Sequence, residues 1–191
     1  MSIYYIADMH FGHESIIEYD GRPFKNAEEM DKVLIKNWNS RVKDDDTVYI
    51  LGDLFFVKDL DVQRSYLEKM PGHKILILGN HDDHLRVGSE QFFDKIADYL
   101  EIEDGGRHVI LSHYPIPFFK NDYDKNWWML HGHVHNNTTD AKYLVGLRDQ
   151  IKRFYSGSIW EPVGNFVNVG CMMPWMDYTP RTLDEICGGE G

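Results

Sequence analysis

The stretch KILILGNHDDH (residues 74–84) begins as an apolar run and ends in a group of polar side chains. The run KILIL has the length and the aliphatic composition of a buried strand. The glycine and the asparagine that follow it are ordinary turn residues. The two histidines and two aspartates after them are also good metal ligands. The stretch therefore predicts a strand that ends either in a solvated turn or in one wall of a binding site.

Other short runs have the same character, and three helix-like stretches accompany the first strands. The runs rich in β-branched and aromatic residues are IYYIA (3–7), TVYIL (47–51), HVILS (108–112), WWML (127–130) and NFVNVG (165–170). The helix-like stretches are NAEEMDKVLIKNWNSRV (26–42), DVQRSYLEKM (61–70) and SEQFFDKIADYL (89–100). Strands that alternate with helices are typical of an α/β fold with parallel pairing. The later strands have shorter connections, which predicts a second, mixed sheet.

Length, charge and cysteine content narrow the class of protein. A chain of 191 residues suits one domain that spans residues 1–191. The net charge of −11 disfavours a nucleic-acid binder, because such proteins neutralise phosphates with basic residues. Two cysteines are too few for a disulfide framework, and no run approaches the roughly 18 apolar residues of a membrane span. We expect a cytoplasmic protein without a membrane partner, and the oligomeric state stays open.

Polar side chains follow five of the predicted strands. They are Asp8, His10, Asp53, Asn80, His81, Asp82, His113, His133 and His135. Open α/β sheets bind ligands at the carboxyl ends of their strands. We therefore expect these side chains to line one shared site.

The chemistry of these side chains favours a pair of transition metal ions. Their donor atoms are oxygen and imidazole nitrogen without thiolate, which suits Mn, Fe, Zn, Ni or Co better than Ca. Asp8 and His10, like His133 and His135, are two residues apart, so an extended segment directs both side chains of each pair to one side. The set is too large for one ion, and it predicts two divalent ions that share a bridging carboxylate.

The order of these residues resembles the motifs of the calcineurin-like metallophosphoesterases. The family motifs D-x-H, G-D, G-N-H-[DE], H and G-H-x-H correspond here to DMH (8–10), GD (52–53), GNHD (79–82), SH (112–113) and GHVH (132–135). The resemblance implies a four-layer architecture, in which helices flank a sandwich of two mixed sheets. It also implies that one metal binds Asp8, His10 and His135. The second metal would bind Asn80, His113 and His133, with Asp53 bridging the two.

The same resemblance implies phosphoester hydrolysis. A hydroxide that bridges the metals would attack in line, His81 would protonate the leaving group, and Asp82 would orient His81. We expect a small phosphate ester as substrate, and favour a phosphodiester such as a cyclic nucleotide or small nucleotide diester over a monoester, because there is no room for a large cap domain. Two alternatives remain. One is a catalytically silent metal-binding scaffold of the same fold, and the other is a metal-dependent nuclease, which the acidic charge disfavours.

Two further residues are candidates for the substrate site. Arg22, in GRPF (21–24), could bind the substrate phosphate with two parallel hydrogen bonds, although a surface ion pair is the alternative that we favour slightly. His13 could line the pocket or support the metal ligands.

Overall fold

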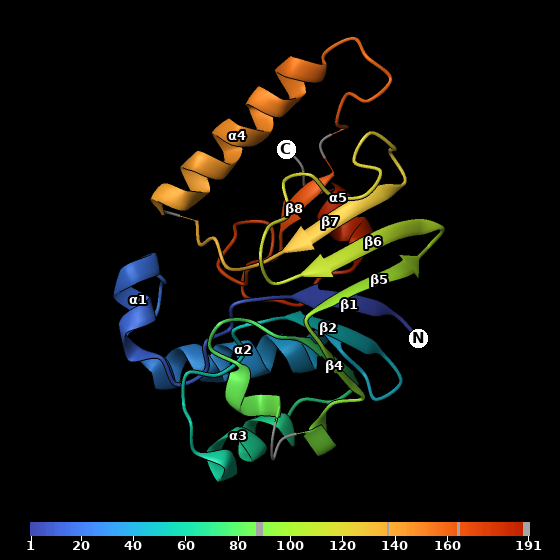
Figure 1. The fold of residues 1–191 in the computed structure, drawn as a ribbon. Coiled ribbons are helices and arrows are strands. Elements are labelled where there is room, and N and C mark those ends of the chain that lie inside the picture. The colour runs from blue at the N-terminus through green and yellow to red at the C-terminus, as the bar shows by residue number, and fades with distance from the viewer. Residues whose placement is uncertain (87–89, 137, 164, 189–191) are drawn as a thin grey trace.

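The protein contains two four-stranded sheets that pack face to face (Figure 1). A computed structural model describes residues 1–86, 90–136, 138–163 and 165–188. The strands of the first sheet, in spatial order, are β1 (Ile3–Ile6), β2 (Thr47–Leu51), β3 (His73–Ile77) and β4 (Lys95–Ala97). Those of the second are β5 (Tyr99–Asp104), β6 (Arg107–Ser112), β7 (Trp127–His131) and β8 (Phe166–Asn168).

Five α-helices accompany the two sheets within the described residues. They are α1 (Glu14–Asp20), α2 (Ala27–Arg41), α3 (Leu60–Leu67), α4 (Thr139–Tyr155) and α5 (Leu183–Gly188). Helix α2 begins where the Asn26 side chain accepts a hydrogen bond from the Glu29 N–H, and it buries Met30, Leu34 and Trp38. Figure 1 shows α2 and α3 beside the first sheet and α4 beyond the second. The layers are therefore helix, sheet, sheet and helix.

One large hydrophobic cluster joins both sheets. In the first sheet it contains Ile50 and Leu76, both fully buried, and in the second it contains Val109 and Leu130. Strands β1 to β3 read as nearly continuous apolar runs because parallel strands are covered on both faces. This packing fixes the carboxyl ends of the strands, where the candidate site lies.

The predicted fold class is confirmed, with one difference in strand direction. The chain forms two sheets flanked by helices, as expected. We expected both sheets to be mixed, but all the strand pairs of the first sheet are parallel. Only the second sheet is mixed, because β5 runs antiparallel to β6.

The predicted helix over residues 89–100 is wrong. Residue 89 lies outside the described residues, and the rest forms a 3₁₀ turn, Glu90–Phe92, followed by β4 and the start of β5. The spacing of Ile96 and Leu100 fits a helix, but Leu100 and Ile102 are also less exposed than their neighbours Tyr99 and Glu101. That alternation has the period of a β-strand. Antiparallel pairing with β6 makes residues 99–104 the edge strand β5.

Helix α4 has no counterpart among the predicted elements. Within α4, whose seventeen residues are all described, Ile151 alone is buried. Figure 1 shows the helix standing apart from the second sheet, and a groove of about 920 Å³ runs beside it. Among the described residues, no helix combines the length and apolar character required to span a bilayer.

Candidate metal centre

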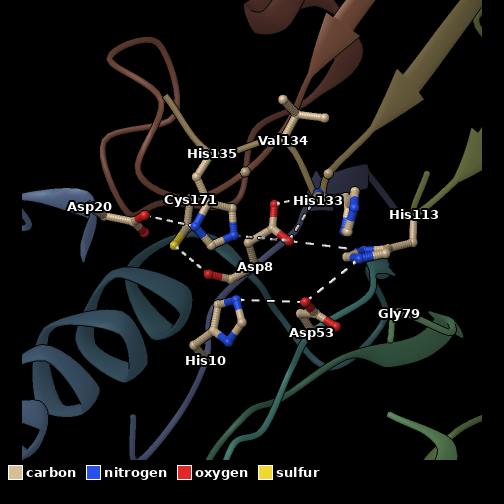
Figure 2. A network of polar contacts seen from close by, with 12 residues as sticks. Asp8, His10, Asp20, Asp53, Gly79, His113, His133, Val134, His135 and Cys171 are labelled. Atoms are coloured by element: carbon tan, nitrogen blue, oxygen red, sulfur yellow. Dashed lines mark hydrogen bonds and ion pairs between the residues drawn. The ribbon is translucent and has the colours of Figure 1, made fainter. Parts of the chain in front are cut away.

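The candidate site lies where strands of both sheets end (Figure 2). Asp8 and Asp53 follow strands of the first sheet, whereas His113, His133 and His135 follow strands of the second. Figure 2 shows the rings of His113 and His135 directed at the two carboxylates. The structure thus brings together side chains that are up to 127 positions apart in the chain, from Asp8 to His135.

The first group of possible ligands consists of Asp8, His10 and His135. One donor atom from each lies within 4.8 Å of the other two. Among the described residues, neither ring nitrogen of His10 has a hydrogen-bond partner, although the side chain is only 2% exposed. Buried polar atoms are almost always paired. A metal ion would satisfy this imidazole, so the donor set fits the predicted ligand role.

The second group is built around His113. Its Nε2 atom lies 3.6 Å from Asp53 Oδ2 and 3.1 Å from Asn80 Oδ1. The Nδ1 atom of His133 lies 3.0 Å from the same Asn80 oxygen. Nitrogen and oxygen donors without thiolate are again the set that suits a divalent transition metal.

Two carboxylates connect the groups. Asp53 Oδ2 lies 3.7 Å from His10 Nε2 and 3.6 Å from His113 Nε2, which places this oxygen between them. Asp8 contributes to both groups, because its donor atoms lie within 4.8 Å of His10 and His135 and also of Asp53 and His113. All seven predicted metal ligands therefore share one site. Their ligand roles, including the bridging role of Asp53, remain predictions.

Four of these residues have unusual backbone conformations. Asp8, His10, Asp53 and His133 have φ angles of 55°, 52°, 51° and 67°. Such left-handed conformations cost roughly 1–3 kcal/mol each in residues other than glycine and persist only when their surroundings impose them. They turn the side chains at the strand ends toward one another.

The glycines of the motifs keep space for the carboxylates. A Cβ atom at Gly79 would lie 2.3 Å from Asp53 Oδ1, and one at Gly132 would lie 2.7 Å from Asp8 Oδ2. Both distances are too short for non-bonded atoms. The motifs require glycine at these positions because the carboxylates approach the backbone so closely.

Other groups orient the histidines. Asp20 Oδ1 lies 2.7 Å from His135 Nδ1, and the Leu51 carbonyl oxygen lies 2.8 Å from His113 Nδ1. Each contact uses Nδ1 and leaves Nε2 facing the centre, as in carboxylate–histidine–metal arrangements. Sequence reasoning missed Asp20. Its position two residues before Arg22, in a segment already of interest, was the available signal.

The electrostatics of the site favour metal binding. Burial lowers the pKa of His10 well below its usual value and also lowers the pKa of His133, so both rings are neutral and can donate a lone pair. Burial alone would lower the pKa of His135 as well, but the hydrogen bond to Asp20 and the charge of Asp8 raise it. Burial raises the pKa of Asp8. A nearby cation would compensate for the cost of this buried carboxylate.

Arg22 has neither of the two roles considered above, which were phosphate binding and a surface ion pair. Its side chain is buried, with 4% exposure, so it neither reaches a substrate phosphate nor forms a surface ion pair. The guanidinium contacts the Asp20 carboxylate at 2.8 Å and donates hydrogen bonds to the carbonyl oxygens of Asp8 and Met9 at 3.0 and 3.2 Å. Arg22 therefore braces the segment that carries the first motif.

The contacts of Asp82 also differ from those expected of a residue that orients His81. Its buried carboxylate accepts hydrogen bonds from the backbone N–H groups of Asp53, Leu54 and Gly79, at 2.6, 3.1 and 2.9 Å. Burial raises the pKa of Asp82 to about 6, which leaves the carboxyl mainly ionised at neutral pH. Asp82 thus ties together the loops that follow β2 and β3.

Replacing Asp82 by alanine is expected to destabilise the protein by about 3 kcal/mol, because three buried N–H groups would lose a charged acceptor. Metal affinity should fall as well, since the loop of Asp53 would be released. Thermal unfolding and metal titration measure both effects. Asp59→Ala is a matched control, because that exposed carboxylate also accepts two backbone hydrogen bonds, at the start of α3. Equal destabilisation by both changes would contradict the anchoring role.

His81 and His13 lie at the open side of the centre. His81 is exposed, its ring centroid lies 5.6 Å from that of His10, and its backbone N–H donates to Asp53 Oδ1 at 3.0 Å. The ring of His13 lies 5.4 Å from that of His10 and is largely buried. His81 therefore lies beside the centre and reaches solvent, as does the predicted ligand His133.

Fold and site together define an α/β two-sheet protein with a histidine- and carboxylate-lined candidate metal centre. No protein-family model matches the chain. The uncharacterized protein MJ1445 of Methanocaldococcus jannaschii is 42% identical over 139 residues, which cover 72% of each chain. The chain belongs to the same family as MJ1445.

Two further relatives support this assignment. The gene 66 protein of Mycobacterium phage L5 is 32% identical over 168 residues, covering 74% of this chain and 81% of that protein. The crystal structure of AQ665 from Aquifex aeolicus, a protein of unknown function, has 30% sequence identity and a TM-score of 0.68, with 97% of each chain covered. The fold is therefore shared over nearly the whole length of both chains.

Proposed function

We propose that the protein is a dinuclear metal-dependent phosphoesterase that hydrolyses small phosphodiesters. The observation that carries the proposal is the convergence of seven oxygen and nitrogen donors, with Asp8 and Asp53 at their centre and His81 exposed beside them. The five motifs that resemble the calcineurin-like metallophosphoesterases supply the same residues in the same order. The structure and the motif order thus support the same site.

The side chains have distinct tasks in such a reaction. Two bound divalent ions would hold the phosphate oxygens and lower the pKa of a water molecule between them. His81 would donate a proton to the leaving oxygen, a role that its exposed position next to His10 supports. Asp20 and the Leu51 carbonyl group hold His135 and His113 in one orientation, so the ligands need no rearrangement when substrate binds.

A diester is favoured over a monoester, and a small substrate over a polymer. The described elements contain no inserted cap that would close over a monoester, and the net charge of −11 would repel a long nucleic acid. Neither Cys171 nor Cys187 forms a disulfide bond, which fits a cytoplasmic enzyme. A silent scaffold is the alternative from another class, but every ligand position and His81 are present.

The test is reconstitution of metal-free protein with Mn, Fe, Zn, Ni or Co. We expect two ions per chain by elemental analysis, and faster hydrolysis of bis-p-nitrophenyl phosphate than of p-nitrophenyl phosphate. Cyclic nucleotides and single-stranded DNA complete the panel. Two bound ions without turnover of any ester would support the scaffold, and preference for DNA would support the nuclease. At most one bound ion would contradict the dinuclear centre itself.

A further inference from the structure

Two exposed aromatic side chains flank the candidate metal centre, and the proposed hydrolysis assigns neither a role. Phe56 is 44% exposed and Tyr114 is 48% exposed. Phe56 lies three positions after Asp53, and Tyr114 directly follows His113. Each therefore extends from a loop that also supplies a candidate ligand, one loop from each sheet.

Phe56 lies on the side of the centre that contains His81. Its ring is stacked on the ring of His13, with centroids 3.6 Å apart and planes only 5° from parallel. The edge of the His81 ring faces it at 5.8 Å. His13 covers one face of the phenyl ring and holds it in place, so the exposed surface is the opposite face and its rim.

Tyr114 lies on the other side of the centre. Its ring centroid is 4.8 Å from that of His133 and 5.0 Å from that of His113, with steep interplanar angles of 64° and 78°. The two histidines thus contact Tyr114 edge to face. Ring contacts thus connect Phe56 to His81 and His10, and Tyr114 to His133 and His113. Asp53 lies between His10 and His113.

We propose that Phe56 and Tyr114 are stacking positions for the two bases of a dinucleoside phosphodiester. This inference rests on the proposed function and adds the residues that would recognise the two bases of such a substrate. Bases stack readily on aromatic side chains, and such stacking tolerates any base. A short diester presents one base on each side of a single phosphate, which matches one aromatic ring on each side of the centre. It also avoids the repulsion that an acidic protein exerts on a long polymer.

The position of His81 distinguishes the two rings. Hydrolysis adds water across the bond between phosphorus and the leaving oxygen, so phosphorus gains the hydroxyl group and the leaving oxygen gains a proton. Because His81 is the proton donor and lies beside Phe56, the base of the departing nucleoside stacks on Phe56. Tyr114 then holds the base of the nucleoside that keeps the phosphate. The products are a nucleoside and a nucleoside monophosphate.

The test compares a dinucleoside monophosphate with glycerophosphoglycerol, a diester without bases. Phe56→Leu and Tyr114→Leu should each raise KM for the dinucleotide roughly tenfold, with little change in kcat. KM for the base-free diester should stay within about twofold. Phe56→Tyr and Tyr114→Phe, which keep an aromatic face, should restore KM. Tyr143→Leu, on the 71% exposed side chain of α4, is the matched control and should change neither substrate.

The outcomes separate this inference from the proposed function. Equal losses on both diesters, or no loss on the dinucleotide, would overturn the stacking role while leaving the phosphoesterase intact. If the metal-loaded protein hydrolyses no ester, the proposed function fails. Equilibrium binding then decides the stacking role on its own: preference for a nucleoside monophosphate over ribose 5-phosphate, abolished by Tyr114→Leu, supports it, and equal binding of both overturns it.

Discussion

Asp53→Asn is expected to leave the protein folded with at most one tightly bound metal ion, and to lower turnover by roughly three orders of magnitude. The oxygen Asp53 Oδ2 lies within 3.7 Å of a nitrogen from each histidine group, at His10 and His113. Asparagine removes the negative charge that this oxygen would share between the two ions. Several kcal/mol of transition-state stabilisation depend on the paired ions, and each 1.36 kcal/mol changes the rate tenfold.

Asparagine is the informative replacement because it tests charge without disturbing the backbone. Asp53 has a φ angle of 51°, a conformation that asparagine tolerates and alanine does not. Elemental analysis after desalting measures bound metal, and circular dichroism checks the fold. Asp46→Asn is the matched control, since that buried carboxylate accepts backbone hydrogen bonds from Ser2 and Lys43 just before β2 begins. If Asp53→Asn retains two ions as firmly as the control, the bridging assignment is wrong.

The sequence predicted the strand ends of the site well because each carries a local signal. An apolar run that stops at glycine and a ligand residue marks a strand end, whatever the rest of the chain does. Asp53 after β2 and His113 after β6 were located in this way. Parallel pairing places each of them at the same edge as the ligand that follows the neighbouring strand of its own sheet. The face-to-face packing of the two sheets then brings the two edges together.

The contacts that support the site were not predictable in this way. Asp82 was expected to orient His81, the residue next to it, but its partners are the backbone N–H groups of Asp53, Leu54 and Gly79. Backbone donors that require an acceptor leave no trace in the sequence. Arg22 was expected to bind phosphate or form a surface ion pair, but it is buried, and besides Asp20 it donates hydrogen bonds to the carbonyl oxygens of Asp8 and Met9.

Helix and strand were confused where one pattern fits both periods. Leu100 satisfies the helical spacing from Ile96 and also the alternation with Ile102, so only the partner strand decides between them. Helix α4 was missed although its sequence carries the helical period, because Leu144, Leu147 and Ile151 recur at intervals of three and four positions.

His81→Ala is expected to keep both metal ions and to lower turnover of diesters with poor leaving groups by a factor of about 10²–10⁴, the usual contribution of a general acid. Alanine retains the backbone N–H that donates to Asp53 Oδ1, so the anchoring of that carboxylate is unchanged. Only the ring is lost, and in the structure it lies at the exposed side of His10.

The leaving group provides the decisive comparison. A nitrophenolate leaves without protonation, so hydrolysis of a nitrophenyl ester should fall far less than that of an alkyl or nucleoside ester. A plot of rate against leaving-group pKa should therefore be steeper for His81→Ala than for the unmodified protein. His73→Ala, at an exposed histidine that pairs with Asp94, is the matched control. Loss of metal would instead identify His81 as a ligand, and an equal loss for all leaving groups would exclude proton donation, because a general acid acts only where the departing oxygen needs a proton.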